Sequence, residues 1–418
     1  MKGGIYMVIF LSKRNRKISF RCFICIFLIC GVLLSSGVFS ADYFAKNSLK
    51  MYAQSYALTD GETGRVLIGK NETAPMANAS TTKILTCILT LEQCDLNEWV
   101  TISSNAANQP KVRLGMKEGE KYLLKDLVYG LMLESYNDCA VAIAEYIAGS
   151  EEAFSDRMNE KAKELGCRDT CFLTPNGLDR ELGEKFHHTT AVDLCRIMAY
   201  CVWQSPKKEE FLQITQTREY HGSANGRTYS FMNRNAFLDQ MEGVLSGKTG
   251  YTAKAGYCYV AAYEENGERY CVALLACGWP NHKTYKWSDT RTLFTYGLEN
   301  YDRKQVIVKE IEEYVEIDGY CRRPSFENIN QSDYLKIKAE ETSYEVLLCE
   351  KDLVKKEIVL YPDIELPIQK GQILGECNIY VEDMLLDKMK LVAVEDAGKW
   401  EWKEIVKVIL FQFLTFYS

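Results

Sequence analysis

The chain has 418 residues, of which 47% are hydrophobic and 26% are charged, a composition typical of a folded protein with two or three domains. It contains only 8 prolines and 27 glycines and shows no repeat period, which excludes a disordered or collagen-like chain. Its formal net charge of −7 argues against general nucleic-acid binding, so no nucleic-acid partner is expected.

The first 40 residues differ in charge from everything that follows. They hold six basic side chains and no acidic one, which leaves 44 basic and 57 acidic side chains, or −13, in the rest of the chain. Within them the uncharged apolar run Cys22–Phe39 follows the basic residues, and Val38-Phe39-Ser40 offers small or modest residues at the two positions that a signal peptidase reads, with Ala41 next. This layout predicts a cleaved secretory signal over residues 1–40. An uncleaved membrane anchor is the alternative, since 18 residues are the lower limit for spanning a bilayer.

Thirteen cysteines follow the signal, and their arrangement does not suggest a disulfide scaffold. The number is odd, and no C-x-x-C pair occurs after residue 40, so a zinc or redox motif has no support. Several lie in apolar surroundings, among them Cys87, Cys139, Cys195 and Cys271. We therefore expect small buried thiols, and neither a metal nor a cofactor.

The order of predicted elements indicates one mixed domain. A hairpin is predicted over residues 55–70, and helical patterns dominate residues 80–203, including 81–93, 124–147 and 151–165. Strands return at 256–263 and 270–277, and a last helix is predicted at about 288–300. Strands at both ends of a helical region predict a single sheet that both ends of the domain complete. We place this domain at residues 41–303.

Two further segments follow this predicted domain. Between residues 304 and 394 apolar residues recur with period two, as at Leu335 and Ile337, which predicts a small half-buried β-domain. Residues 395–418 predict an amphipathic helix rich in aromatic residues, with only 11 residues after Lys407. That is too short to span a bilayer, so we expect the helix to lie at a membrane surface. Docking on the protein's own core is the alternative.

Three short motifs stand in chain order. Ser80-Thr81-Thr82-Lys83 is S-x-x-K, Ser135-Tyr136-Asn137 is S-x-N and Lys248-Thr249-Gly250 is K-T-G. Together they are the set typical of penicillin-binding proteins and serine β-lactamases. Each of the first two is weak alone, because Ser205–Lys208 is a second S-x-x-K and Ser103–Asn105 and Ser223–Asn225 are further S-x-N matches.

Sequence context separates the motif set from its chance copies. An apolar helical pattern begins directly after Ser80–Lys83, which places Ser80 and Lys83 one turn apart on one helix face. Ser205 is instead followed by proline and a charged stretch. Ser135–Asn137 interrupts an apolar helical region, where polar residues are costly unless they face a cavity or a network. Lys248-Thr249-Gly250 precedes a predicted strand that could receive a substrate at a sheet edge.

With these motifs, the chain resembles the serine-type D-alanyl-D-alanine carboxypeptidases, low-molecular-mass penicillin-binding proteins of peptidase family S11. Further matching stretches are 127–133, 137–138, 144–145, 174–179, 188–191 and 233–235. The resemblance covers about residues 45–395 and implies an α/β (α+β) penicillin-recognising serine hydrolase domain, β-lactamase/transpeptidase-like, with an antiparallel sheet flanked by helices and a small all-β C-terminal domain. Tyr136 departs from the family, which usually has glycine there; a larger side chain could narrow the site or alter substrate preference.

The resemblance also implies a mechanism without metal or cofactor. Ser80 attacks the carbonyl between two D-alanines of a peptidoglycan stem peptide, after Lys83 has taken its proton; burial and the Lys248 charge would favour the neutral Lys83 amine. Ser135 relays a proton to the leaving D-alanine, and Asn137 holds Lys83 and the substrate amide. The remaining roles fall to the K-T-G strand: Lys248, Thr249 and Gly250 bind the terminal carboxylate, and the backbone N–H groups of Tyr251 and Ser80 hold the oxyanion.

The resemblance also implies partners and a location. β-Lactam antibiotics are expected to act as covalent inhibitors, and the protein is expected outside the cytoplasm, on the outer face of the cytoplasmic membrane or in the cell wall. A Ser-His-Asp triad using His187 or His188 with Asp193 is disfavoured because a lysine base is already placed. We expect Thr189 or Thr190 to cap a helix instead.

Two other functions compete with the carboxypeptidase. A class A β-lactamase would need a glutamate in E-x-x-L-N between S-x-N and K-T-G, and none is present. The nearest pattern, Gln93–Asn97, lies before Ser135 and starts with glutamine. A catalytically inactive cell-wall-binding protein is the second alternative, disfavoured because all polar motif residues remain.

Overall fold

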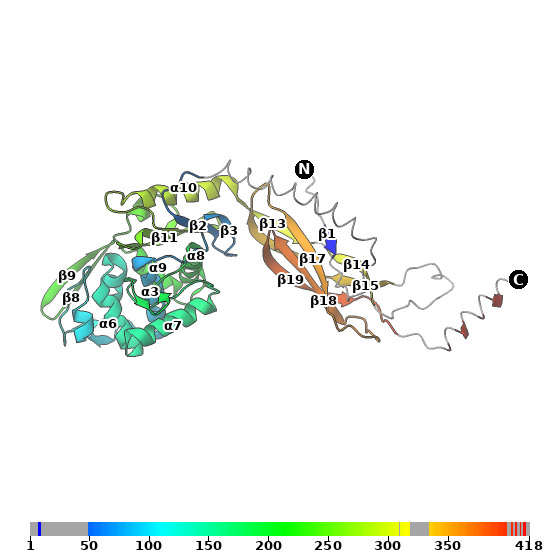
Figure 1. The fold of residues 1–418 in the computed structure, drawn as a ribbon, viewed down its shortest axis with the longest axis horizontal. Coiled ribbons are helices and arrows are strands. Elements are labelled where there is room, and N and C mark those ends of the chain that lie inside the picture. Colours follow the sequence, from blue (N-terminus) through cyan, green and yellow to red (C-terminus); the bar gives the residue numbers. More distant parts are fainter. Residues whose placement is uncertain are drawn as a thin grey trace. The chain divides into compact units, whose positions relative to one another are not determined.

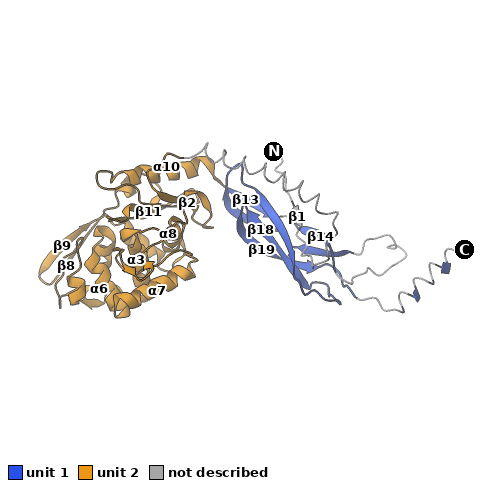
Figure 2. Ribbon diagram, in the orientation of Figure 1, with its two compact units in different colours: residues 1–41, 303–418 blue, residues 42–302 orange. Residues whose placement is uncertain are grey.

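The computed structural model describes residues 7–9, 49–308, 310–317, 334–398 and six positions between 403 and 414. The chain divides into two compact units: residues 42–302, the large unit, and residues 303–418 with 1–41, the small unit (Figures 1 and 2). The predicted secretory signal over residues 1–40 lies outside the described residues, except for Met7–Ile9, which form strand β1.

A five-stranded antiparallel sheet lies at the centre of the large unit, with the strand order β10-β11-β12-β2-β3. Strand β2 pairs with β12, with Ala57 opposite Ala273, so the first and last strands of the unit are neighbours. This confirms the prediction of one sheet completed by both ends. The strands are β2 (Ser55–Asp60), β3 (Val66–Lys70), β10 (Val244–Thr252), β11 (Gly256–Glu265) and β12 (Glu268–Leu275).

Both faces of this sheet are covered by helices (Figure 1). Helix α10 (Tyr285–Asn300) lies on one face, where Gly297 packs against Leu58 and Tyr270. Side chains of alternating positions, such as Ala57 and Cys271, point into the core shared with the helical body. The alternation is the period-two pattern of strands, here with both faces apolar because both are buried.

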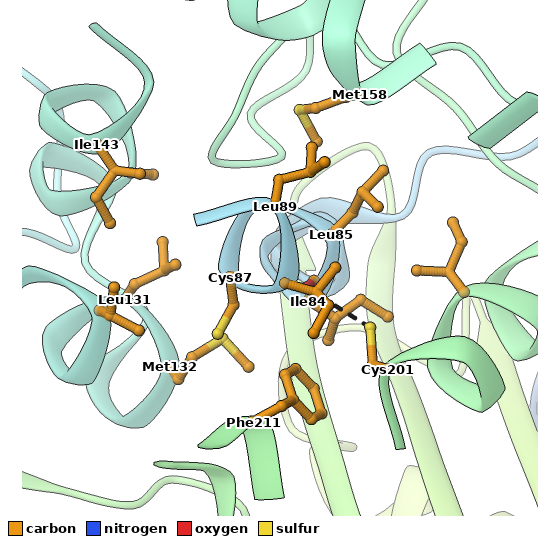
Figure 3. Packing of buried hydrophobic residues seen from close by; sticks show 14 of the residues in the cluster. Ile84, Leu85, Cys87, Leu89, Leu131, Met132, Ile143, Met158, Cys201 and Phe211 are labelled. Atoms are coloured by element: carbon orange, nitrogen blue, oxygen red, sulfur yellow. Dashed lines mark hydrogen bonds between the residues drawn. The ribbon is translucent and has the colours of Figure 1, made fainter. Parts of the chain in front are cut away.

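The helical body surrounds one central helix, α3 (Lys83–Gln93), in which every residue from Lys83 to Leu91 is buried. Figure 3 shows Ile84, Leu85, Cys87 and Leu89 of α3 among Leu131, Met132, Ile143, Met158, Cys201 and Phe211 from other segments. A helix that is apolar all round belongs in a core. The other helical elements are η2 (Ala79–Thr82), α4 (Ser104–Ala107), α5 (Leu124–Tyr129), η3 (Gly130–Glu134), α6 (Asn137–Ala148), α7 (Glu151–Glu164), α8 (Ala191–Ala199), η4 (Tyr200–Gln204), α9 (Lys208–Gln216) and η5 (Ala236–Asp239).

One local prediction needs correction, and two strand features were not predicted. The helix predicted over 124–147 is broken into α5, the π-helical turn η3 and α6, with Ser135 in left-handed conformation between them. The K-T-G motif precedes the strand that begins at Gly256, as predicted, but it also lies in a strand of its own, β10. The hairpin of β8 (Glu219–Ala224) and β9 (Arg227–Met232) was not predicted, although its Asn225-Gly226 turn is a hairpin signal, because its strands are polar and exposed. The short pairs are β4 (Trp99–Thr101) with β5 (Lys121–Leu123) and β6 (Glu181–Leu182) with β7 (Lys185–Phe186).

The small unit is a β-structure, as the period-two pattern predicted. Its larger sheet has the order β1-β17-β18-β19-β15-β14, and β13 pairs with β16. Leu335, Ile337, Cys377, Ile379 and Leu391 are fully buried in its core, while their neighbours in sequence are more exposed. The strands are β13 (Asp302–Val308), β14 (Ile311–Glu316), β15 (Tyr334–Ala339), β16 (Thr342–Leu348), β17 (Val354–Leu360), β18 (Ile373–Val381) and β19 (Met384–Ala393).

Six positions of the predicted tail helix are described, and all are helical and exposed. Among them are Val406, Leu410, Phe413 and Leu414, with 40 to 70% of their surface exposed. These apolar side chains therefore do not contribute to the core of the small unit. Within the described part of the chain, no helix is both long enough and apolar enough to cross a membrane.

The described cysteines agree with the expectation of buried thiols. All twelve of them are free, and Cys87, Cys139, Cys195 and Cys271 are fully buried. Burial raises the pKa of the Cys195 thiol to about 12, because the thiolate would be desolvated. The Cys195 thiol is therefore protonated at neutral pH in the folded protein.

Candidate active site

Ser80 lies in the short 3-10 turn η2, directly before the buried helix α3. The turn is tightly constrained: Ala79 has a φ of +48°, and a Cβ on Gly177 would stand only 2.0 Å from the Ala79 carbonyl oxygen. Such strained backbone next to a reactive residue is typical of functional sites. The consequence is that the Ser80 side chain remains half-exposed while Lys83, one turn later, is completely buried.

The Lys83 amine is held by three oxygen atoms. Its Nζ lies 2.7 Å from Ser80 Oγ, 3.0 Å from Asn137 Oδ1 and 2.6 Å from the Asn176 carbonyl oxygen. Three acceptors satisfy an ammonium group. A neutral amine has two N–H donors and one lone pair, so the same geometry lets it donate to Asn137 and Asn176 and accept the Ser80 hydroxyl proton. The site therefore accommodates both protonation states.

Burial decides between these states. Loss of hydration lowers the pKa of Lys83 well below its usual range, and the positive charge of Lys248 lowers it further. Lys248 is 3% exposed, and its burial lowers its pKa to about 7. Two lysines that share a site cannot both be charged easily, which favours a neutral amine beside Ser80 and a charged one on the sheet.

Asn137 is fixed as the first residue of α6. Its backbone N–H donates to the Val112 carbonyl at 2.8 Å, and its side-chain Nδ2 donates to the Pro110 carbonyl at 3.3 Å. The next residue, Asp138, accepts hydrogen bonds from the N–H groups of Leu114 and Gly115. These contacts hold the loop of residues 110–115 against the start of α6 and leave Asn137 Oδ1 facing Lys83.

Ser135 and Lys248 form the second polar contact of the site. Lys248 Nζ donates to Ser135 Oγ at 2.9 Å and to the Thr249 carbonyl at 3.0 Å. Ser135 has a φ of +66°, a left-handed conformation that residues other than glycine rarely adopt. Because Asn137, two residues after Ser135, accepts a hydrogen bond from Lys83 Nζ at 3.0 Å, both serine–lysine pairs belong to one site.

Strand β10 brings the K-T-G motif beside the Ser80 backbone. A Cβ on Gly250 would stand 2.9 Å from Ser80 N and 2.9 Å from the Asn78 carbonyl oxygen, so only glycine permits this approach. β10 is the edge strand of its sheet, with Thr249 half-buried and Tyr251 43% exposed. An edge strand has unpaired backbone groups that can bind an extended peptide.

The repeated motifs do not form a similar site. Ser205 Oγ donates to Glu92 Oε1 at 2.6 Å, and Ser103 is the N-cap of α4, where its Oγ accepts from the Ala106 N–H. Ser223 lies exposed on β8. These serines have structural or surface positions, as the sequence context indicated.

His187 is not placed as a catalytic base. It is buried, and desolvation together with the charges of His188 and Lys83 lowers its pKa to about 3. Its Nδ1 accepts from the Leu173 N–H, and its Nε2 lies 2.9 Å from Thr82 Oγ1. Asp193 instead accepts hydrogen bonds from residues 168–170, so no Ser-His-Asp triad exists among these residues.

The helix-capping prediction is confirmed at Thr190. Its side chain accepts a hydrogen bond from the Asp193 N–H at 3.1 Å and so caps α8. The described residues also contain no group of three or more His, Cys, Asp or Glu side chains that could hold a metal ion.

The sequence interpretation gave no role to two backbone features of the site. The Asn176 carbonyl binds both Lys83 Nζ and Ser80 Oγ, the latter at 3.4 Å. The loop of residues 110–115 fixes Asn137. The sequence Pro175-Asn176-Gly177 indicates a turn, but it does not show in which direction the Asn176 carbonyl group points. Tyr136 packs its ring edge-on against Phe231, with centroids 5.5 Å apart, which places it on the side of the β8–β9 hairpin.

Comparisons with known proteins agree with this geometry. The family model of D-alanyl-D-alanine carboxypeptidase, peptidase S11, matches residues 42–277, and that of the penicillin-binding protein 5 C-terminal domain matches residues 331–399. D-alanyl-D-alanine carboxypeptidase DacF of Bacillus subtilis is 29% identical over 384 residues, which cover 89% of this chain and 94% of that protein.

Solved structures show the same fold. The D-alanyl-D-alanine carboxypeptidase DacD of Francisella tularensis aligns with a TM-score of 0.63 at 23% identity, over 84% of this chain and 95% of that one. Penicillin-binding protein D2 of Listeria monocytogenes, solved in a cefotaxime-bound form, aligns with a TM-score of 0.53 at 25% identity, over 60% of this chain and 99% of that one. The predicted fold class is thus confirmed. The chain belongs to the D-alanyl-D-alanine carboxypeptidase family, peptidase S11, and is a serine-type hydrolase.

Proposed function

We propose that this protein removes the terminal D-alanine from peptidoglycan pentapeptide stems through a Ser80 acyl-enzyme, and that penicillins inhibit it by acylating the same serine. The observation that carries the proposal is the buried Lys83 amine 2.7 Å from Ser80 Oγ. A serine hydroxyl needs an adjacent base to act as a nucleophile at neutral pH, and this amine is in place and has a lowered pKa.

The reaction has two steps. In the first, Ser80 Oγ bonds to the carbonyl carbon between the two D-alanines while Lys83 takes the hydroxyl proton, and the C–N bond breaks. Ser135, bound to Lys248, relays a proton from Lys83 to the leaving amine, so that Lys83 is neutral again. In the second step, water gives a proton to Lys83 and attacks the ester, and Lys83 returns that proton to Ser80 Oγ as the ester C–O bond breaks and the shortened stem peptide leaves. The backbone N–H groups of Ser80 and Tyr251 hold the oxyanion in both steps.

Recognition of the substrate is assigned to the edge strand. The charged Lys248, with Thr249 and Gly250, binds the terminal carboxylate of the stem peptide, where a charge-assisted hydrogen bond is stronger than a neutral one. Asn137 binds the substrate amide while it holds Lys83 at 3.0 Å. β-Lactams occupy the same place, as the cefotaxime-bound Listeria protein supports.

The test uses the purified full chain with two compounds. A fluorescent penicillin should label Ser80 covalently, and a stem pentapeptide should release one D-alanine per molecule, measured by a coupled amino-acid oxidase assay. Absence of both activities would refute the enzymatic proposal. Rapid hydrolysis of the penicillin without D-alanine release would indicate a β-lactamase instead.

The organisation of the chain is part of the proposal. Residues 1–40 act as an export signal, 41–303 form the catalytic domain, 304–394 form the β-rich C-terminal domain and 395–418 form a membrane-surface helix. The exposed apolar side chains at Val406, Leu410 and Leu414 support the last assignment, because they can contact the apolar part of a bilayer. The protein then acts on the outer face of the cytoplasmic membrane, next to its substrate.

Deletion after Lys399 should release the protein from membranes without loss of activity, because the tail carries none of the proposed catalytic residues. The measurement compares the membrane and soluble fractions, and D-alanine release, for the full and the shortened chain. A Val406→Ala, Phe413→Ala double variant should show weakened membrane binding of the same kind, and the matched change Lys403→Ala, Lys407→Ala tests the contribution of charge. If the shortened chain, with its signal removed, still sediments with membranes, the anchor lies elsewhere.

A further inference from the structure

Ser135 needs support from outside its own loop. Its left-handed conformation (φ +66°, ψ +33°) is unfavourable for a residue with a Cβ, so neighbouring contacts must hold it. The conformation has a clear effect, because it leaves Ser135 Oγ 2.9 Å from Lys248 Nζ. The residues on either side of Ser135 show where the support comes from.

Glu134, directly before Ser135, is clamped to the end of strand β9. Its Oε1 accepts from the Met232 N–H at 2.9 Å, and its Oε2 accepts from Arg234 Nε at 2.8 Å. Arg234 also donates its backbone N–H to the Leu133 carbonyl at 3.1 Å. Glu134 is 8% exposed, so its carboxylate depends on these donors. One carboxylate oxygen therefore binds the last residue of β9, and the other binds the segment that follows it.

The residue after Ser135 is held by the same hairpin. Tyr136 packs against Phe231 of β9 and lies beside Gly130 of η3. The hairpin itself is fixed to α5, because Asp126 accepts hydrogen bonds from the hydroxyl groups of Tyr220 and Tyr229. Ser135 thus lies between Glu134 and Tyr136, both of which contact strand β9 of this hairpin.

The segment that holds Glu134 is also tied to the strand that carries Lys248. Asn235 receives a hydrogen bond at its Oδ1 from Tyr259 Oη at 2.7 Å, and Tyr259 of β11 is directly opposite Thr249 of β10. Asn233 binds the C-terminal end of helix α9, because its Nδ2 donates to the carbonyl groups of Thr215 and Thr217. Residues 233–235 therefore bridge the loop of Ser135 and the strand of Lys248.

We propose that the Glu134–Arg234 ion pair is a positioning device for the reaction: it sets the Ser135 loop against β10 so that Ser135 Oγ meets Lys248 and can pass a proton to the leaving D-alanine. This inference rests on the proposed function. Glu134 and Arg234 act through Ser135 and do not touch the reacting atoms. Small misplacements of a proton donor cost a reaction about 10²-fold, so the pair governs turnover.

The test measures kcat and KM for D-alanine release by the full chain, together with thermal unfolding. Arg234→Met should lower kcat about 10- to 100-fold with KM within about twofold, because Lys248 and the edge strand still bind the substrate. Glu134→Gln should act in the same direction, because its amide cannot accept from both donors. Arg234→Lys keeps a cation beside Glu134 and should restore most of the lost turnover.

A matched control lies at the other end of the same hairpin. Arg227 is the first residue of β9, next to the hairpin turn, and its Nη2 forms an ion pair with Glu120 Oε2 at 2.6 Å. Arg227→Met should keep kcat within about twofold even where it lowers the unfolding temperature as much as Arg234→Met does. The inference would be overturned if Arg227→Met and Arg234→Met lost kcat equally, or if Glu134→Gln kept the wild-type kcat. In either case, D-alanine release by the wild type would still support the proposed function. A wild type that releases no D-alanine would refute both.

Discussion

Ser80→Ala should abolish covalent labelling by a fluorescent penicillin and lower D-alanine release by at least about 10³-fold. The variant lacks the only oxygen that the Lys83 amine can activate at 2.7 Å, so no acyl-enzyme can form. The fold should be preserved, since the half-exposed Ser80 side chain makes few contacts. Mass spectrometry after incubation with penicillin, and an unfolding curve, provide the measurements.

The second S-x-x-K motif supplies the control. Ser205→Ala removes a hydroxyl of the same kind, whose contact is a hydrogen bond to Glu92 Oε1 at 2.6 Å. This variant should lose some stability, about 0.5–1.5 kcal/mol, and keep labelling and turnover close to the wild type. Persistent labelling in Ser80→Ala, or its loss in Ser205→Ala, would show that the nucleophile has been misassigned.

Lys83→Met should lower the rate of acylation by at least about 10³-fold, because it removes the base and keeps the length of the side chain. The protein should still fold, since methionine suits a fully buried position at the start of α3. Stopped-flow labelling with fluorescent penicillin measures the rate. The exposed Lys208 of the second motif gives the matched change, Lys208→Met, which should leave the rate unaltered. Acylation of Lys83→Met at the wild-type rate would exclude Lys83 as the base.

The two lysines also predict the pH dependence. Both have lowered pKa values, so both lose their protons at lower pH than a free lysine. As pH rises through the pKa of Lys83, the neutral base accumulates and kcat/KM increases. As pH rises through about 7, Lys248 loses its charge and with it the attraction for the carboxylate, so kcat/KM falls. A bell-shaped profile follows, and its descending limb should be absent in a Lys248→Gln variant of low activity.

Much of this arrangement could be predicted from the sequence. The apolar pattern after Ser80 placed Ser80 and Lys83 one turn apart, and the polar residues Ser135–Asn137 within an apolar helical region indicated a cavity or a polar network. Both patterns depend on neighbours in the chain, which a sequence displays directly. The sheet completed by both ends followed from the order of the elements alone, and the structure confirms it.

The parts that could not be predicted depend on contacts distant in the chain. The Asn176 carbonyl lies 93 positions from Lys83, and no side-chain pattern reveals the direction of a carbonyl group. The β8–β9 hairpin, which binds Glu134, has polar and exposed strands. Its apolar alternation is therefore too weak to predict strands from the sequence. The π-helical turn before Ser135 likewise arises from tertiary packing that overrides helix propensity.

The pairing of β2 with β12 has a consequence for how the chain acquires its structure. Ala57 meets Ala273 only after more than 200 further residues have been synthesised, so the central sheet cannot be completed before nearly all of the large unit has been made. Long-range pairings of this kind slow folding, because the chain loses the entropy of closing a large loop before it gains any contact energy. The strand order that brings the two ends of the large unit together therefore also places the completion of its central sheet late in folding.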